Sequence, residues 1–344
     1  MSSLRRGTNS GPAAGLNRQG WIRESKGQHL DPAQNGFLSR PLNLIWRRKI
    51  IDSVLESYFI KEVLLATLGR PIRTIAFEDN APPPLMNDAL IVSFNTELAN
   101  YIRAARAQGC RNIGIFHMAD ERGEDDRGFY AEADYVLRHY WFEKTLARPN
   151  DRSLGVAWVP NGFRNGVGPI SSQTMLRMGD RTIKGFFAGM VEGHFTAGER
   201  KAMVHAIESA KLPFIVVKTP AFGQGLGPVS YAAYLSSARF APIPAGNSPE
   251  TIRLYDALEA GAIPIMLRSP YVAAPDALGN PPFILLDSWS ELPAAYAPYA
   301  GADTPAAIKR LEAKQREIVD WWKGFKLRQQ QKVKELIDRS FARS

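Results

Sequence analysis

The chain of 344 residues is long enough for one large or two medium domains, and its hydrophobic content of 45% supports a full globular core. Its single cysteine, Cys110, excludes an internal disulfide and favours a reducing compartment. No apolar run approaches the length of a membrane span, and the N-terminus lacks a signal-peptide core. These features predict a cytoplasmic protein.

The formal net charge of +9 is concentrated at the two ends of the chain. Residues 1–50 contain nine Lys or Arg against two acids, and residues 301–344 contain eleven against six. Basic ends of this kind can hold a protein peripherally on an anionic membrane surface, or they can be merely solvated. We expect no nucleic-acid partner.

The first half of the chain predicts a tail followed by a parallel sheet. Residues 1–40 are rich in Gly, Ser, Asn and Arg without periodicity, which is typical of a disordered basic tail. Apolar residues at helical spacing predict a long amphipathic helix from Asn43 to Leu68. Short apolar runs then alternate with helical or loop stretches, as in a parallel sheet with crossover helices. The expected strands are 74–77, 89–94, 112–116, 135–137 and 156–159.

The second half repeats this alternation after a polar stretch from Asn161 to about Arg181, the predicted interlobe linker. Strands are expected at 185–188, 214–217, 240–242, 263–267 and 283–286. Helices are expected at 197–210, 228–237, 249–260 and 304–323. We therefore predict an α/β protein with two Rossmann-like lobes, over 41–165 and 166–305, whose parallel sheets face a cleft. Residues 306–344 would form C-terminal helices that return to the first lobe.

Residues 237–267, SARFAPIPAGNSPETIRLYDALEAGAIPIML, read as strand, glycine turn, helix and strand. Ser248 is the predicted N-cap, and the proline after it fits the first helical position. A helix N-terminus binds anions through its free N–H groups, and Arg253 one turn inside adds a cation. Asp256 lies near enough to accept hydrogen bonds from a sugar diol. The stretch predicts a site for diphosphate and ribose, with Glu250 counted among its residues.

The sequence of this stretch, with RLYDA at 253–257 and GAIP at 261–264, resembles the donor-nucleotide motif of exostosin-like glycosyltransferases. That family has the two-lobed GT-B fold, and within it the resemblance is nearest to the ribitol-phosphate xylosyltransferases. It extends downstream through 282–284, 289–293 and 321–326, with a weaker echo upstream at 116–121 and 136–141. The resemblance implies a UDP-sugar donor, with xylose as the suggested sugar, and a glycan or polyol-phosphate acceptor.

Two other features are candidates for contacts with the donor. Lys218 directly follows the apolar run PFIVV, at the carboxyl end of a strand where open α/β sheets bind ligands. Gly189, with Gly193, follows the first strand of the second half and can let backbone approach a phosphate. An exposed lysine at a strand end remains the plain alternative for Lys218.

An inverting sugar transfer needs a general base, and a carboxylate or histidine can serve. Asp120, Glu121 and His117, in that order, follow the strand NIGIF of the first lobe, where they would face the cleft. The alternative for Asp120 is a cap on the following loop. Arg138 can neutralise a phosphate or form a salt bridge to that acidic loop.

The acids from Glu121 to Asp126 are interpreted as a solvated loop rather than a metal site, and no Cys/His spacing suggests zinc. We therefore expect metal-independent catalysis, with Arg253, Lys218 and the helix N-terminus stabilising the leaving diphosphate. The predicted function is an inverting glycosyltransferase. The alternatives are a GT-B-fold nucleotide-sugar epimerase and a non-enzymatic basic binding module.

Overall fold

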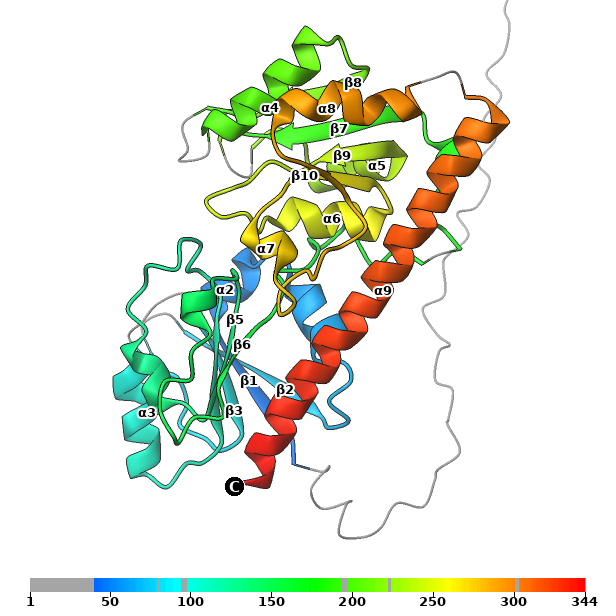
Figure 1. Cartoon of the computed structure of the whole chain (residues 1–344). Helices are drawn as coiled ribbons and strands as arrows, with labels where there is room; N and C mark the ends of the chain where they lie inside the picture. Colours follow the sequence, from blue (N-terminus) through cyan, green and yellow to red (C-terminus); the bar gives the residue numbers. More distant parts are fainter. Residues whose placement is uncertain are drawn as a thin grey trace, which may run out of the picture.

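Two parallel β-sheets form the two halves of the molecule, with helices packed against their faces (Figure 1). The computed structural model describes residues 40–78, 81–93, 98–171, 173–192, 197–221, 224–300 and 303–343. Residues 1–39 of the predicted disordered tail (1–40), and Gly193, lie outside these residues; Arg40 is described and pairs with Asp88. In the described part of the chain, no helix is both long enough and apolar enough to cross a membrane.

The first sheet has the order β2-β1-β3-β4-β5-β6, and all of its strand pairs are parallel. Its strands read as continuous apolar runs where both faces are covered. The bounds are β1 (Leu42–Arg47), β2 (Ile72–Phe77), β3 (Ala89–Ser93), β4 (Ile113–His117), β5 (Tyr135–Arg138) and β6 (Val156–Trp158). The five strands predicted for this half are confirmed within a few residues.

The helix predicted from Asn43 to Leu68 is wrong, because its first part is strand β1. Trp46 and Ile45 are both fully buried, and they point into different core clusters on the two faces of the sheet. A central strand is covered on both faces, so its side chains are apolar at consecutive positions. A short apolar run of this kind cannot be told from a turn of a buried helix by periodicity alone. The rest forms α2 (Arg48–Ser53) and the π-helical turn η1 (Phe59–Leu64).

The second sheet has the order β11-β10-β9-β7-β8, again with parallel pairs. Its strands are β7 (Ile183–Gly189), β8 (Phe214–Lys218), β9 (Ala238–Pro242), β10 (Ile263–Leu267) and β11 (Ile284–Leu286). All five were predicted from the sequence. The two sheets in succession confirm the predicted α/β architecture of two Rossmann-like lobes.

The helices lie mainly between successive strands. The longer ones are α3 (Leu98–Ala107), α4 (Ala197–Ser209), α5 (Pro228–Ser237) and α6 (Ile252–Ala260), and the short ones are α7 (Pro270–Ala273) and α8 (Leu292–Tyr296). The single helical turns are η2 (Gly128–Glu132), η3 (Glu143–Thr145), η4 (Met178–Asp180), η5 (Trp289–Glu291) and η6 (Ala297–Tyr299). The predictions for α4 and α5 are confirmed to within one residue.

The last helix, α9 (Pro305–Ala342), runs along both lobes (Figure 1). It begins at a side-chain cap, where Ala307 N donates to Thr304 Oγ1. On the second lobe, Trp322 Nε1 donates to Glu259 Oε2 at 2.8 Å. On the first lobe, Asp338 pairs with Arg70 at 2.8 Å. The predicted return of the C-terminal helix to the first lobe is confirmed, and one continuous helix makes it.

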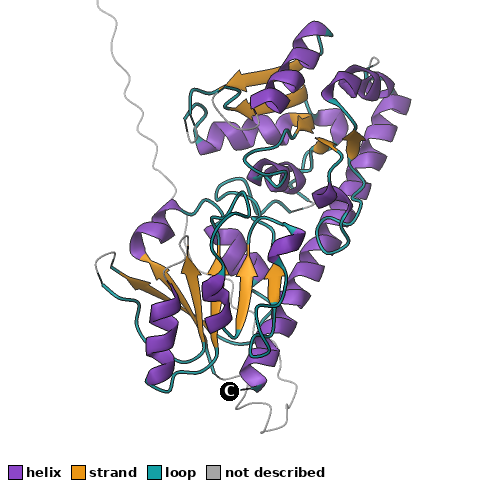
Figure 2. Cartoon of the chain, turned by 60° about the vertical axis from the view of Figure 1, so that its left-hand side comes forward, coloured by secondary structure: helices purple, strands orange, loops and turns teal. Residues whose placement is uncertain are grey.

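The strands of the first sheet point their carboxyl ends toward the second lobe (Figure 2). In open parallel sheets, ligands bind at this edge. The loops that follow β4, β5 and β6 also carry the polar contacts between the lobes. The candidate functional site therefore lies where these loops meet the loops that follow β7 and β9.

Candidate functional site between the lobes

Glu250, in the loop between β9 and α6, connects the two lobes. Its carboxylate is 3% exposed and accepts four hydrogen bonds. The donors are Trp141 N (3.0 Å), Trp158 Nε1 (2.8 Å), Asn161 N (3.1 Å) and Tyr255 OH (2.8 Å). Burial raises the pKa of Glu250, while these hydrogen bonds oppose that shift. Because both oxygens are engaged by protein donors, the predicted contact of Glu250 with a nucleotide does not fit this geometry.

The helix that was predicted to begin at Pro249 begins instead at Ile252. Ser248 is not its N-cap: Ser248 Oγ donates to Glu250 O at 3.0 Å and accepts from Glu250 N at 3.1 Å, which closes a tight turn. Thr251 is the N-cap and makes no side-chain cap hydrogen bond. The turn directs the Glu250 side chain to the first lobe, so the segment before α6 serves contact between the lobes.

Arg253 and Gly189, both predicted to contact phosphate, lie against each other. Arg253 Nε donates to Ala188 O at 2.9 Å, and its guanidinium lies 5.5 Å from the ring centre of Phe187. A methyl group at Gly189 would overlap the Arg253 guanidinium. Burial lowers the pKa of Arg253 to about 10, which leaves it charged at neutral pH. The end of β7 therefore holds a cation beside a bare stretch of backbone.

Arg200, in α4, adds a second cation that the sequence did not reveal. It is 6% exposed, and it donates to Ala245 O (3.0 Å) and Met190 O (2.7 Å). Its charge acts on the pKa of Arg253, so the two guanidiniums are neighbours. Within the part of the chain that the structure describes, no carboxylate lies within 4.0 Å of either guanidinium. Arg200 and Arg253, together called the arginine pair, bring two cations to this edge of the second sheet without a direct ion-pair partner; Glu199, Glu121 and Asp256 act on them from further away.

Asp256 was predicted to bind a ribose, but its carboxylate is fully buried. It accepts from Arg164 N at 2.8 Å and Arg164 Nε at 2.7 Å, and from Tyr231 OH at 3.2 Å. The Arg164 guanidinium also lies 4.0 Å from the centre of the Tyr231 ring. Asp256 therefore anchors the start of the interlobe linker on α6, and no face of its carboxylate is open to a ribose.

Asp120 is also held by protein groups. It is 4% exposed, accepts from Arg138 Nη2 at 3.0 Å, and accepts from Glu124 N (2.8 Å) and Asp125 N (3.1 Å). Burial alone would raise its pKa, but the hydrogen bonds from Asp125 N, Arg138 and Glu124 N lower it. A carboxylate with a lowered pKa and three donors is a poor proton acceptor. The geometry matches the alternative of a cap on the acidic loop.

His117 lies beside this ion pair and is 1% exposed. Its Nδ1 is 2.7 Å from Tyr130 OH and its Nε2 is 3.1 Å from Asp125 Oδ2. Burial, and then the charge of Arg138, lowers the pKa of His117. Ligand atoms of His117, Asp120 and Asp125 lie within 4.8 Å of one another, a spacing that suits a metal ion. The guanidinium already paired with Asp120 opposes a second cation there.

Glu121 is the one predicted base whose carboxylate extends to the second lobe. Its Oε2 accepts from Asn247 Nδ2 at 2.6 Å, and its Oε1 accepts from Tyr140 OH at 3.2 Å. Tyr140 has a φ of 58°, a backbone conformation that is rare for a large residue and collects at functional sites. These contacts place the loops after β4, β5 and β9 around one polar space.

Lys218 does not point into this space. Its side chain is 54% exposed and pairs with Glu208 of α4 at 3.0 Å. This arrangement corresponds to the exposed strand-end lysine that was the alternative. The predicted role of Lys218 as a diphosphate clamp has no support from its position.

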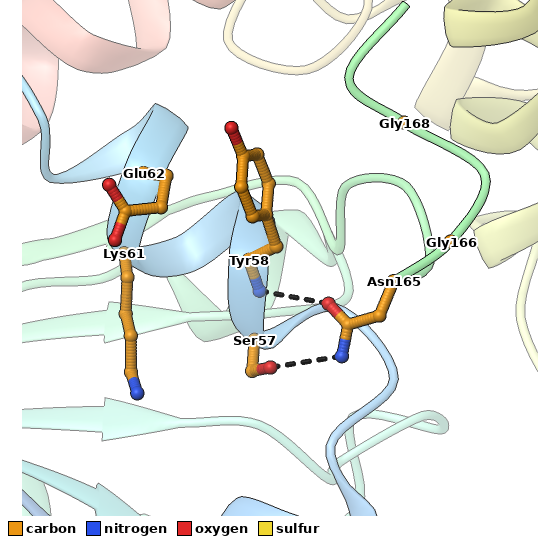
Figure 3. Close-up of a pocket in the computed structure, with 7 residues that line it drawn as sticks. All are labelled: Ser57, Tyr58, Lys61, Glu62, Asn165, Gly166 and Gly168. Carbon is orange, nitrogen blue, oxygen red and sulfur yellow. Dashed lines mark hydrogen bonds between the residues drawn. The ribbon is translucent and has the colours of Figure 1, made fainter. Parts of the chain in front are cut away.

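A cavity of about 310 Å³ opens between η1 and the linker (Figure 3). Its wall is fixed by Asn165, which accepts from Tyr58 N at 3.0 Å and donates to Ser57 Oγ at 2.9 Å. Lys61 carries a positive charge on this wall. The lining residues are Ser57, Tyr58, Lys61, Glu62, Asn165, Gly166 and Gly168.

The comparisons with known proteins agree with the resemblance in the donor segment. Residues 227–342 match the family model described as the RXYLT1 C-terminal domain. That range contains α5, β9, α6, β10 and the whole of α9, together with Arg253 and Glu250. No curated protein sequence matches the chain. The resemblance to RXYLT1-related, exostosin-like glycosyltransferases is thus confirmed for the C-terminal third.

Two solved structures are distantly similar in fold. One is the crystal structure of a GtfA/B complex, with 11% identity and a TM-score of 0.38, covering 72% of this chain and 58% of that one. The other is apo UGT2 from Phytolacca americana, with 11% identity and a TM-score of 0.35, covering 82% of this chain and 94% of that one. Likenesses at this level do not locate a site.

Proposed function

Because residues 227–342 match the RXYLT1 C-terminal domain, we propose that this protein is a glycosyltransferase. It moves a sugar from a UDP-sugar to a hydroxyl of a glycan or polyol-phosphate acceptor, with inversion at the anomeric carbon. Xylose is the sugar that the family match favours. The cleft between the lobes holds the reacting groups.

The observation that carries this proposal is the arginine pair. Both guanidiniums are buried against main-chain carbonyls, and neither forms an ion pair with a described carboxylate, although Glu199 and Glu121 act on Arg200 and Asp256 acts on Arg253 from further away. Buried cations are costly unless an anion compensates them. A diphosphate supplies that charge, and the missing side chain at Gly189 leaves room for the Arg253 guanidinium at the end of β7. The same cations stabilise the negative charge that develops on the leaving diphosphate.

UDP binding measured by calorimetry tests this site. Replacing Arg253 with Ala removes a charge-assisted contact worth about 1.5–3 kcal/mol, so UDP affinity should fall at least about tenfold. Lys218→Ala is the matched control, since it removes an exposed cation of the same lobe and should leave the affinity unchanged. Equal UDP affinity of Arg253→Ala and the parent, with both folded, would reject the site.

The epimerase alternative uses the same donor site and differs in its products. A transferase releases free UDP in step with acceptor consumption, whereas an epimerase returns an isomeric UDP-sugar without any acceptor. Chromatography of the nucleotide products, with and without acceptor, separates the two. The binding-module alternative places function in the basic ends, so truncation of residues 1–39 would abolish function there and spare turnover in a transferase.

A further inference from the structure

Glu56 is a carboxylate of the first lobe that has no predicted role and no strong partner. It lies between α2 and η1, in the loop that follows β1, and its side chain is 13% exposed. In the described residues, one basic nitrogen lies within 4.0 Å of it, His139 Nδ1 at 3.7 Å. That separation is too long for a hydrogen bond. Glu56 is thus half-enclosed without the ion pair that usually accompanies a buried acid.

The neighbouring His139 is equally unusual. Its side chain is fully buried, and neither ring nitrogen has a hydrogen-bond partner among the described residues. Its ring packs edge-on against Phe116, with centroids 4.9 Å apart. Burial lowers the pKa of His139 to about 3, so the ring is neutral and offers one N–H donor and one acceptor. A buried polar group without partners calls for an explanation, and a role toward Glu56 is one.

The charges around Glu56 place it at the interlobe cleft. Burial is the main reason that the pKa of Glu56 rises to about 7; a hydrogen bond from its own main-chain N–H opposes this shift, Asp256 and Glu250 raise the pKa further, and Arg164 lowers it. Asp256 and Glu250 belong to the second lobe, so Glu56 faces that lobe. Arg164 also acts on the pKa of Arg253, so the Arg164–Asp256 ion pair lies near both Glu56 and Arg253.

The surroundings of Tyr140 agree with this placement. Glu121, Glu250 and Glu56 all raise the pKa of its hydroxyl, after burial as the main cause. The strained backbone at Tyr140 therefore brings its hydroxyl among three carboxylates from both lobes. Glu250 is saturated with protein donors, and Glu121 accepts from Tyr140 and Asn247. Glu56 is the one of the three whose carboxylate accepts no hydrogen bond from another described side chain.

We infer that Glu56 is the general base of the transfer, with His139 as its positioning residue. This inference rests on the proposed function. The acceptor hydroxyl oxygen forms a bond to the anomeric carbon, and the bond from that carbon to the diphosphate oxygen breaks with its electron pair going to UDP. The hydroxyl proton passes to the Glu56 carboxylate. The base lies in the first lobe and the leaving group in the second, as an attack from opposite sides requires.

The pKa of Glu56 near neutrality suits this task, since both protonation states are populated at working pH. Its charged neighbours are Arg164, Asp256 and Glu250, with neutral His139 and the Tyr140 hydroxyl beside them. A neutral His139 can accept the proton of protonated Glu56 in a hydrogen bond or donate to its carboxylate after a small movement. It orients the acid without fixing it in the charged state.

The test compares Glu56→Gln with the parent for UDP affinity and for turnover. Loss of a general base typically lowers kcat by about 10²–10⁴, whereas UDP affinity should stay within about twofold. Glu78→Gln, which alters an exposed first-lobe carboxylate paired with Arg48, should leave both unchanged. Near-parental turnover of Glu56→Gln would overturn the inference. A parent protein that neither binds UDP nor turns over would instead overturn the proposed function.

Two further measurements distinguish a catalytic role of Glu56 from a purely structural one. In the parent, kcat should rise with pH through about 7 as Glu56 ionises, and this limb should disappear in Glu56→Gln. His139→Phe keeps a buried ring but removes both nitrogens, so it should move the pH limb and reduce kcat while leaving the UDP affinity intact. An unchanged pH limb in both variants would assign the base to another residue.

Discussion

Replacing Glu250 with Gln should strongly destabilise the contact between the lobes. The carboxylate accepts two hydrogen bonds on each oxygen: Oε2 from Trp141 N and Trp158 Nε1, and Oε1 from Asn161 N and Tyr255 OH. Gln replaces one oxygen with an NH₂ group. At the Oε2 position this group would face the donors Trp141 N and Trp158 Nε1; at Oε1 it would face Asn161 N, while the Tyr255 hydroxyl can turn to accept from it. At least one buried donor therefore loses its acceptor. Each unsatisfied buried donor costs about 1–3 kcal/mol. In the more favourable amide orientation one such donor is lost, so we expect a loss of about 1–3 kcal/mol in the free energy of unfolding.

Urea unfolding followed by tryptophan fluorescence measures this loss, because Trp141 and Trp158 both contact Glu250. Glu317→Gln on the exposed face of α9 is the control, since its pair with Lys314 is solvated and worth under about 1 kcal/mol. A Glu250→Gln loss below about 1 kcal/mol would refute the argument that these four contacts hold the lobes together.

Further outcomes follow from the same geometry. Gly189→Ala should displace the Arg253 guanidinium and lower UDP affinity in calorimetry by about tenfold, and unchanged affinity would separate Gly189 from the site. Asp120→Asn should leave kcat within about threefold of the parent, since a near-complete loss would identify Asp120 as the base after all. Because the folded pKa of Asp120 is lowered, its stabilising effect is full above about pH 4 and is lost as pH falls further, which acid unfolding of parent and variant can compare. We expect the cavity of Figure 3 to bind an anionic acceptor beside Lys61, so Lys61→Ala should raise KM for that acceptor without changing UDP affinity; an equal KM would show that the acceptor binds elsewhere.

The sequence predicted the strands well because buried parallel strands are short apolar runs bounded by polar turns. The sequence-based prediction was wrong where an apolar segment fitted both the strand and the helix periodicity. In LNLIWR the apolar residues satisfy both a two-sided strand and one turn of a helix, and long-range pairing of β1 with β2 and β3 decided for the strand. No local signal carries that pairing.

The site was predicted in part, for a related reason. Arg253 and Gly189 carry local signals, a helix start and a glycine after a strand, and the structure brings them together. Glu250 and Asp256 carry the same helix-start signal, but their carboxylates turn to partners that lie about ninety residues earlier in the chain. Arg200 lies in a helix and Glu56 in a loop, and the sequence around each carries no motif that marks a functional residue. Their significance comes from what they lack, a paired charge, and only the folded chain reveals that.

The contacts between the lobes imply that the cleft is largely formed before any ligand binds. Separating the lobes would break the Glu250 contacts and the bond from Asn247 to Glu121. It would also bend α9, which packs on Glu259 in one lobe and on Arg70 in the other. Such a cleft spends little binding energy on closure, so affinity for UDP should report the arginine pair directly. The strained Tyr140 fits this view, because strain persists only where the surrounding structure enforces it. The proposed base in the first lobe and the arginine pair in the second are then held at a fixed separation, which is what the proposed in-line transfer requires.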